Sequence, residues 1–186
     1  HTAGNDINES IGMIVAANDV AQNPESVGNA LKVLSLRIRG AKTELKEMGE
    51  DTETVAESTS KLQASIKGLT GVDIMKSATE FKSTYQIMDE LAAKWKELDD
   101  ISKASTLEQL AGKNRANVVA GMLENWQDAK AAADAARDSY GSAEAELDKY
   151  KESIAGLSEQ LKASFGALSE TLLDDDIVKG LLKIAT

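Results

Sequence analysis

The sequence predicts an all-α fold, with helical hairpins and a long C-terminal helix packed as a module of a larger, elongated protein. Apolar residues recur every three or four positions through most of the 186 residues, which is the period of a helix with one buried face. The chain has one proline and only 4% aromatic residues, so aliphatic side chains and alanine must form the core. Glycines and capping-box spacings separate the apolar runs. They favour helices that fold back over one continuous rod.

The first predicted region, residues 1–22, is one helix that continues a preceding segment. Ile7, Ile11 and Ile14 lie at helical spacing on one face. Asn23 followed by Pro24 has the residue types preferred at an N-cap and in a first turn. One helix should therefore end before Asn23, and the next should begin there.

Residues 23–75 are predicted to form a helical hairpin. Its first arm is a single helix that passes through Gly40 and stops at Gly49. The apolar seam of this arm alternates steps of four and three residues: Val27, Leu31, Leu34, Ile38, Ala41, Leu45 and Met48. The second arm should begin at Thr54–Glu57, which has the spacing of a capping box. Residues 72–75 fit either an extended piece or a loop inserted into the core.

Residues 76–139 are predicted to form a helical subdomain. Capping-box spacings at Ser77–Glu80 and Ser105–Glu108 should each begin a helix, and two helices should meet near Gly112. Residues 129–136 are rich in alanine, which favours a closely packed helix. Two aromatic residues fall on apolar helix faces and are expected in the core: Trp95 and Trp126.

Residues 140–186 complete the prediction with a long helix and an apolar tail. The chain should turn or kink at residues 140–142. The apolar seam that follows, over residues 147–172, drifts sideways, as expected of a straight helix and not of a heptad supercoil. Residues 177–184 form the apolar tail.

Composition argues against several classes of function. A net charge of −10 disfavours nucleic acids and anionic membranes as partners, because both attract Lys and Arg. The chain has no cysteine, and His1 is its one histidine, so thiol chemistry, a Ser-His-Asp triad and a histidine-bound zinc are not expected. The apolar run over residues 11–17 is too short to span a bilayer. We expect a chain that is not an enzyme, with no catalytic residue, metal site or cofactor.

Two groups of aspartates are the remaining candidates for chemistry, Asp99–Asp100 and Asp174–Asp176. Paired carboxylates serve in glycoside cleavage and in binding hard cations. The triplet, however, lacks the alternate spacing and the glycine of a calcium loop. We therefore interpret both groups as solvated helix ends or caps.

Basic residues at two places are candidates for partner binding. Lys113 and Arg115 cluster beside Gly112, where the start of a helix also favours anions. Arg37 and Arg39 lie close together on the predicted helix of the first arm and would form a basic face for an acidic partner. A solvated helix junction is the simpler interpretation at Gly112, and a solvated face paired with local glutamates is the simpler one at Arg37.

The most informative segment is residues 107–123, which contains the sequence LAGKNRANV. It resembles the core region of tail tape measure proteins from long-tailed phages and prophages of Gram-positive bacteria. Six further blocks agree with this resemblance in the order of the family: 4–10, 23–31, 37–45, 71–75, 81–85 and 140–143. The chain departs from the family at Asn114, where arginine is more common.

The resemblance implies a structural, non-enzymatic role. Such proteins set tail length by occupying the tail lumen, and they take part in tail assembly and genome ejection. The implied partners are the tail tube protein, tail assembly chaperones and tail tip proteins, and a homo-oligomer is also compatible with the resemblance. The implied location is the virion tail, after assembly in the host bacterial cytoplasm. Two alternatives stay open: a generic helical interaction module of a secreted or surface protein and, least favoured, a carboxylate-based cell-wall hydrolase.

Overall fold

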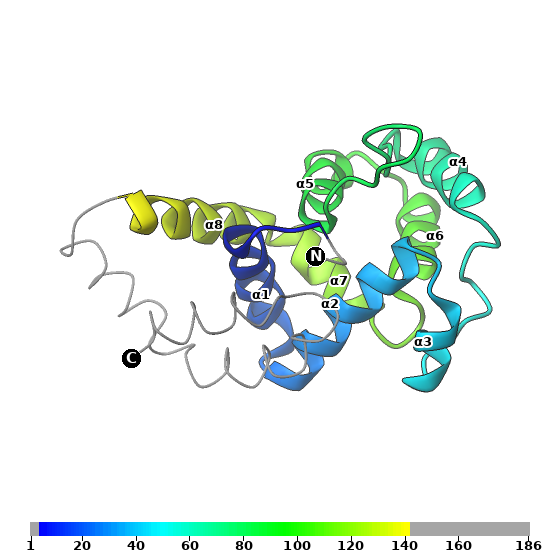
Figure 1. The fold of residues 1–186 in the computed structure, drawn as a ribbon, viewed down its shortest axis with the longest axis horizontal. Helices are drawn as coiled ribbons and strands as arrows, with labels where there is room; N and C mark the ends of the chain where they lie inside the picture. Colours follow the sequence, from blue (N-terminus) through cyan, green and yellow to red (C-terminus); the bar gives the residue numbers. More distant parts are fainter. Residues whose placement is uncertain (1–3, 142–186) are drawn as a thin grey trace.

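The computed structural model describes residues 4–141, and their fold is all-α, as predicted. Within this range the chain forms eight helices and no sheet, with one isolated antiparallel bridge between Met75 and Phe81 (Figure 1). The helices are α1 (Ile7–Ala21), α2 (Pro24–Ile38), α3 (Lys42–Glu47), α4 (Thr59–Thr70), α5 (Thr84–Trp95), α6 (Asp100–Ala111), α7 (Ala116–Glu124) and α8 (Trp126–Gly141). The predictions for residues 142–186, including the long helix and Asp174–Asp176, and for His1 lie outside the described residues.

One main core holds most of these helices together. It takes apolar side chains from α1, α2, α4 to α8 and the loop between α4 and α5, among them Ile11, Ile14, Val27, Leu31, Leu34, Ile38, Leu62, Ile66, Ile74, Ile87, Leu91, Leu110, Val119, Met122 and Ala129. Trp95 and Trp126 are buried in it, which confirms the prediction for both. None of the helices within residues 4–141 is long and apolar enough to cross a lipid bilayer.

Local capping signals explain where α1 and α2 begin. Asp6 caps α1, because its carboxylate accepts from the Glu9 amide while the Glu9 side chain accepts from the Asp6 amide. Asn23 caps α2 by accepting from the Ser26 amide at 3.1 Å, and Pro24 occupies the first turn. The predicted boundary at Asn23 is confirmed.

The single helix predicted through Gly40 is wrong, because the chain breaks there into α2 and α3. Gly40 has φ +69°, and the Ala41 amide donates to the Leu36 carbonyl at 2.9 Å, while the Gly40 amide donates to that of Arg37 at 3.1 Å. This pair of bonds closes a helix C-terminus and places the glycine in the left-handed region. The apolar spacing nevertheless continues beyond Gly40, because Ala41, Leu45 and Met48 pack in a second apolar cluster that is separate from the main core.

Three predicted helix starts are also wrong. Thr54–Glu57 and Ser77–Glu80 lie in loops, and Ser105–Glu108 lies inside α6. The residues that cap α4, α5 and α6 are Ser58, Ser83 and Asp99. The three-residue spacing of a capping box also occurs inside helices and loops, so it does not mark a start unless the first hydroxyl is available. The Thr54 hydroxyl, for example, bonds to the Glu108 carbonyl instead.

The chain between α4 and α5 is a loop inserted into the core, which was one of the two alternatives for residues 72–75. Val72 and Ile74 are 1% and 0% exposed. The Lys82 amide donates to the Ile74 carbonyl at 3.0 Å. Next to this loop, Asn5 accepts a hydrogen bond from the Tyr85 amide at 2.8 Å. The segment before α1 is thereby tied to the start of α5.

α1 and α8 make the most extensive helix contact in the described part of the chain. A methyl group on Gly12 would overlap the carbonyl oxygen of Ala129 and come within 3.1 Å of the Ala133 side chain. Ala129, Ala133 and Ala136 are fully buried, so the close packing predicted for the alanine-rich helix is confirmed. The helix includes residues 140 and 141, so the turn predicted there is not reached before the described residues end.

Candidate functional site

The structure does not bring the four predicted basic residues together on one exposed surface. Arg37 is 1% exposed, although Arg39, two residues later, is half-buried. Lys113 is exposed, whereas Arg115 is engaged by a carboxylate. Arg37 therefore belongs neither to a solvated face nor to an exposed basic one.

Arg37 lies at the centre of a polar network that joins α2, α6 and the loop after α3. Its Nε donates to the Gln109 carbonyl at 2.9 Å, and its Nη2 donates to the Glu108 carbonyl at 2.9 Å and to the Thr54 hydroxyl. Its Nη1 donates to the Asp51 carbonyl at 2.6 Å. We call this network the arginine junction; its members are Arg37, Glu50, Asp51, Thr54, Glu108, Gln109, Gly112, Asn114 and Arg115.

The charge of Arg37 is compensated mainly by backbone dipoles. The carbonyls of Glu108 and Gln109 belong to the last turn of α6, where the helix dipole is negative, and the Glu108 carbonyl also accepts from the Gly112 amide at 3.1 Å. Burial lowers the pKa of Arg37, and the nearby charges of Asp51, Glu50 and Glu108 oppose this shift. The arginine thus serves as a cap for the C-terminus of α6.

Gly112 lets the backbone pass over the Arg37 guanidinium. A Cβ at this position would lie 3.0 Å from Nη1 and 3.3 Å from Cζ. The residue also has φ +70° and ψ 175°, a conformation that is essentially restricted to glycine. The glycine of LAGKNRANV is therefore required by its contact with Arg37 and by its backbone angles.

Glu50 occupies the anion site that the sequence suggested beside Gly112. Arg115 donates to Glu50 Oε1 from Nε at 2.9 Å and from Nη2 at 2.6 Å, and Asn114 donates to Oε2 at 3.3 Å. The Glu50 side chain is only 5% exposed. Arg115 therefore binds a carboxylate of the chain itself, so the joint is better described as a structural contact than as an open anion site.

Arg39 is held on the opposite side of the α2 terminus. Its guanidinium lies over the Phe81 ring, with Cζ 5.4 Å from the ring centroid, and Nη1 donates to the Ser35 carbonyl at 3.4 Å. Burial lowers the pKa of Arg39. This residue ties α2 to the loop that precedes α5.

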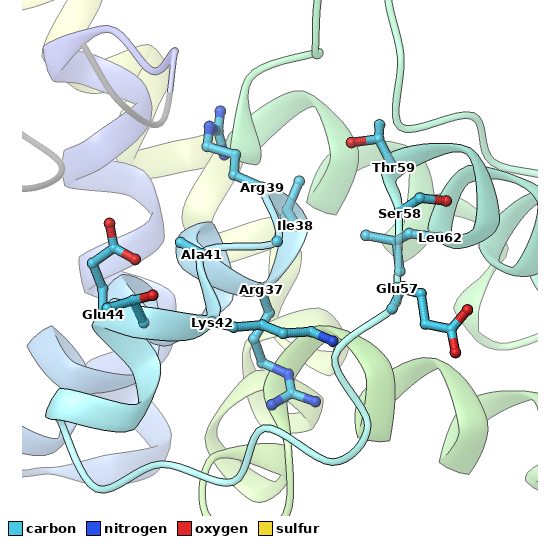
Figure 2. Close-up of a pocket in the computed structure, with 13 residues that line it drawn as sticks. Arg37, Ile38, Arg39, Ala41, Lys42, Glu44, Glu57, Ser58, Thr59 and Leu62 are labelled. Carbon is cyan, nitrogen blue, oxygen red and sulfur yellow. The ribbon is translucent and has the colours of Figure 1, made fainter.

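A polar pocket of about 430 Å³ adjoins the arginine junction (Figure 2). One wall is the turn from Arg37 to Glu44, and the other is residues 56–59 with Leu62 of α4. Figure 2 shows Lys42 extending across the gap towards the second wall, while Glu44 and Glu57 point away from it. Within residues 4–141, no group of three histidine, cysteine or acidic side chains is placed to hold a metal ion.

Asp99 is a helix cap, as one of the two sequence interpretations proposed. Its carboxylate accepts from the Ser102 amide at 2.7 Å and from the Ser102 hydroxyl at 3.0 Å. These hydrogen bonds lower the pKa of Asp99. Asp100 follows in the first turn of α6, where the helix dipole stabilises a negatively charged carboxylate.

The sequence interpretation missed Glu50, Asp51 and Thr54 as members of the junction. Glu50 and Asp51 stand between the two predicted arms of the hairpin, and Thr54 was assigned to a capping box. Their partners lie far along the chain, since Glu50 and Arg115 are separated by 65 positions. The one local signal was a pair of neighbouring acids directly after a helix-ending glycine.

No protein-family model matches the chain, and no solved structure matches it.

Proposed function

We propose that this chain is a structural part of a phage tail tape measure protein, which sets tail length and takes part in tail assembly and genome ejection. Its partners would be the tail tube protein, the tail assembly chaperones and the tail tip proteins. It would act in the virion tail, after assembly in the bacterial cytoplasm. The chain would work as a scaffold and not as an enzyme.

The observation that carries the proposal is that the blocks behind the family resemblance contact one another in the fold. Arg37 of block 37–45 packs under Gly112 of segment 107–123. Asn5 of block 4–10 accepts from Tyr85 of block 81–85. Such residues are the ones that a shared fold would restrict, so their joint occurrence supports a common architecture over chance similarity.

A third block pair shows the same relation. Ile74 of block 71–75 accepts from the Lys82 amide of block 81–85 at 3.0 Å, and the same two blocks contain the Met75–Phe81 bridge. Segments separated in the sequence therefore meet in pairs, and each pair holds a turn or a helix end. This supports a packed module as the part of the tape measure that the chain represents.

Tail length gives a quantitative test of the proposal. One continuous helix of 138 residues would extend about 210 Å at ~1.5 Å per residue, whereas a packed module of that size has a radius of gyration of about 14 Å. In the phage that encodes the chain, we expect mass spectrometry to find it in purified tails. An in-frame deletion of residues 4–141 should shorten tails by much less than 210 Å or block their assembly.

Absence of the chain from purified tails, together with normal tails after the deletion, would overturn the proposal. Shortening by about 210 Å would retain the tape measure function but reject the packed module inside the tail. Turnover of peptidoglycan by the purified chain would favour the hydrolase alternative instead.

A further inference from the structure

α2 packs between two separate apolar clusters. Towards the main core it presents Val27, Leu31, Leu34 and Ile38. Its other face carries Val33 and Leu36, 0% and 4% exposed. These two join a smaller group, which we call the flap cluster: Val33, Leu36, Leu45 and Val55, with the partly buried Ala41 and Met48. Residues 41–55, here called the flap, supply the rest of this cluster.

The flap is bounded by a glycine at one end and by the main core at the other. Gly40 has φ +69°, and a Cβ there would meet no atom within 4 Å. At the far end, Ala56 packs against the main core. Between these limits the flap contains α3 and the loop to Val55. Figure 1 shows α3 at the edge of the molecule, away from α5 and α8.

Within the described residues, side chains make the hydrogen bonds that hold the loop of the flap to α2, to α6 and to the α6–α7 joint. Arg37 donates to Asp51 and Thr54, the Thr54 hydroxyl donates to the Glu108 carbonyl at 3.1 Å, and Arg115 binds Glu50. The flap itself is acidic, since five carboxylates outnumber two lysines: Glu44, Glu47, Glu50, Asp51 and Glu53 against Lys42 and Lys46. It is therefore an acidic segment held by two arginines of the body.

We propose that the flap opens as a unit about Gly40, with Arg37 and Arg115 as its latch, while the main core stays folded. Opening exposes only the small flap cluster and replaces the latch hydrogen bonds with hydrogen bonds to water. The free-energy cost of opening the flap is therefore small. Opening of the main core exposes far more apolar surface. The flap therefore belongs to the low-stability end of the molecule, and its release uncovers the outer face of α2 and the Arg37 guanidinium.

Native-state hydrogen exchange on the unmodified chain tests this proposal. A detached helix of six residues is not stable alone, so the amides of α3 exchange whenever the flap opens. We expect the Leu45 and Glu50 amides to exchange at least about tenfold faster than the slowest amides of α1 and α8. Equal protection in the flap and in α1 would overturn the proposal.

Thiol labelling gives an independent test, because the chain has no cysteine of its own. Val33→Cys places one thiol under the flap, and Val27→Cys places a matched thiol on the main-core face of the same helix; both valines are 0% exposed. Under native conditions we expect the first thiol to react at least about tenfold faster than the second. Equal rates would mean that the two clusters open together.

The latch is tested by adding Arg115→Gln to each cysteine variant. This change breaks the ion pair with Glu50 and should raise labelling at position 33 about tenfold, with little change at position 27. Arg137→Gln is the matched control, because Arg137 pairs with Asp134 on α8, far from the flap in sequence. A similar rise at both thiols, or no rise at position 33, would reject Arg115 as a latch.

Discussion

The contact between α1 and α8 and the contact between the flap and α6 are held by opposite means. The first depends on an absent side chain, since Gly12 lets two backbones approach and the facing residues are alanines. The second depends on long side chains, since Arg37 reaches both the flap and the last turn of α6, and Arg115 reaches the flap. Close packing excludes water over a broad area, whereas polar bonds can be exchanged for water one at a time. One contact should therefore be rigid and the other releasable.

A matched pair of leucine substitutions tests whether the main core and the flap cluster contribute differently to stability. Leu34 and Leu45 are both 0% exposed, but Leu34 faces the main core and Leu45 faces the flap cluster. Leu34→Ala should lower the free energy of unfolding by about 3 kcal/mol. Leu45→Ala should lower it by less, because the loss cannot exceed the free energy of opening the flap.

Tryptophan fluorescence during urea unfolding measures this difference, because Trp95 and Trp126 both lie in the main core. Equal shifts of the two midpoints would mean that the flap and the main core form one cooperative unit, and the contrast between them would be lost.

A pair of glycines tests the packed contact. Gly12→Ala should lower the free energy of unfolding by about 1–3 kcal/mol, because its methyl group overlaps the Ala129 carbonyl. Gly68→Ala is the control, since Gly68 lies in α4 with open space around it and should gain up to about 1 kcal/mol from helix propensity. Thermal unfolding of both variants supplies the measurement. A stabilised Gly12→Ala variant would contradict the close approach of the two backbones.

The smallest expected effect concerns the charges beside the packed contact. Burial raises the pKa of Asp19 at the end of α1, and so do the charge and hydrogen bond of Asp128 on α8. A raised pKa in the folded state means that protonation adds stability below the unfolded pKa, and that this stability is lost as pH rises through the folded pKa.

Asp19→Asn should therefore raise stability near neutral pH by less than about 0.5 kcal/mol, because the group is largely exposed. Below the usual pKa of aspartate, the variant and the original chain should unfold at the same temperature. An advantage of the variant that persists in acid would assign the effect to something other than charge.

Sequence patterns located the parts of this fold whose causes are local. The start of α2 at Asn23–Pro24 was predictable because the capping side chain of Asn23 and the Ser26 amide that donates to it lie within three residues. Trp95 and Trp126 were predictable because each falls on an apolar helix face. The break at Gly40 was not, since the apolar spacing runs unchanged from the main core into the flap cluster. Spacing alone does not say which cluster a residue will join.

The arginine junction was only half predictable. Gly112 and Arg115 were singled out from the family-like segment, but their partners were not. Arg37 was assigned to a surface because arginine is usually solvated, whereas its acceptors are carbonyls 71 and 72 positions away. Such partners leave no periodic trace in the sequence, because a backbone carbonyl is present whatever the side chain.

The missing side chain at Gly12 restricts how α8 can align against α1. Its neighbours Ile11 and Met13 carry bulky side chains. A shift of α1 by one residue would place one of these side chains where Gly12 now contacts the Ala129 backbone. Only one alignment of the two helices is accommodated. The direction of α8 relative to α1 is consequently fixed by this contact.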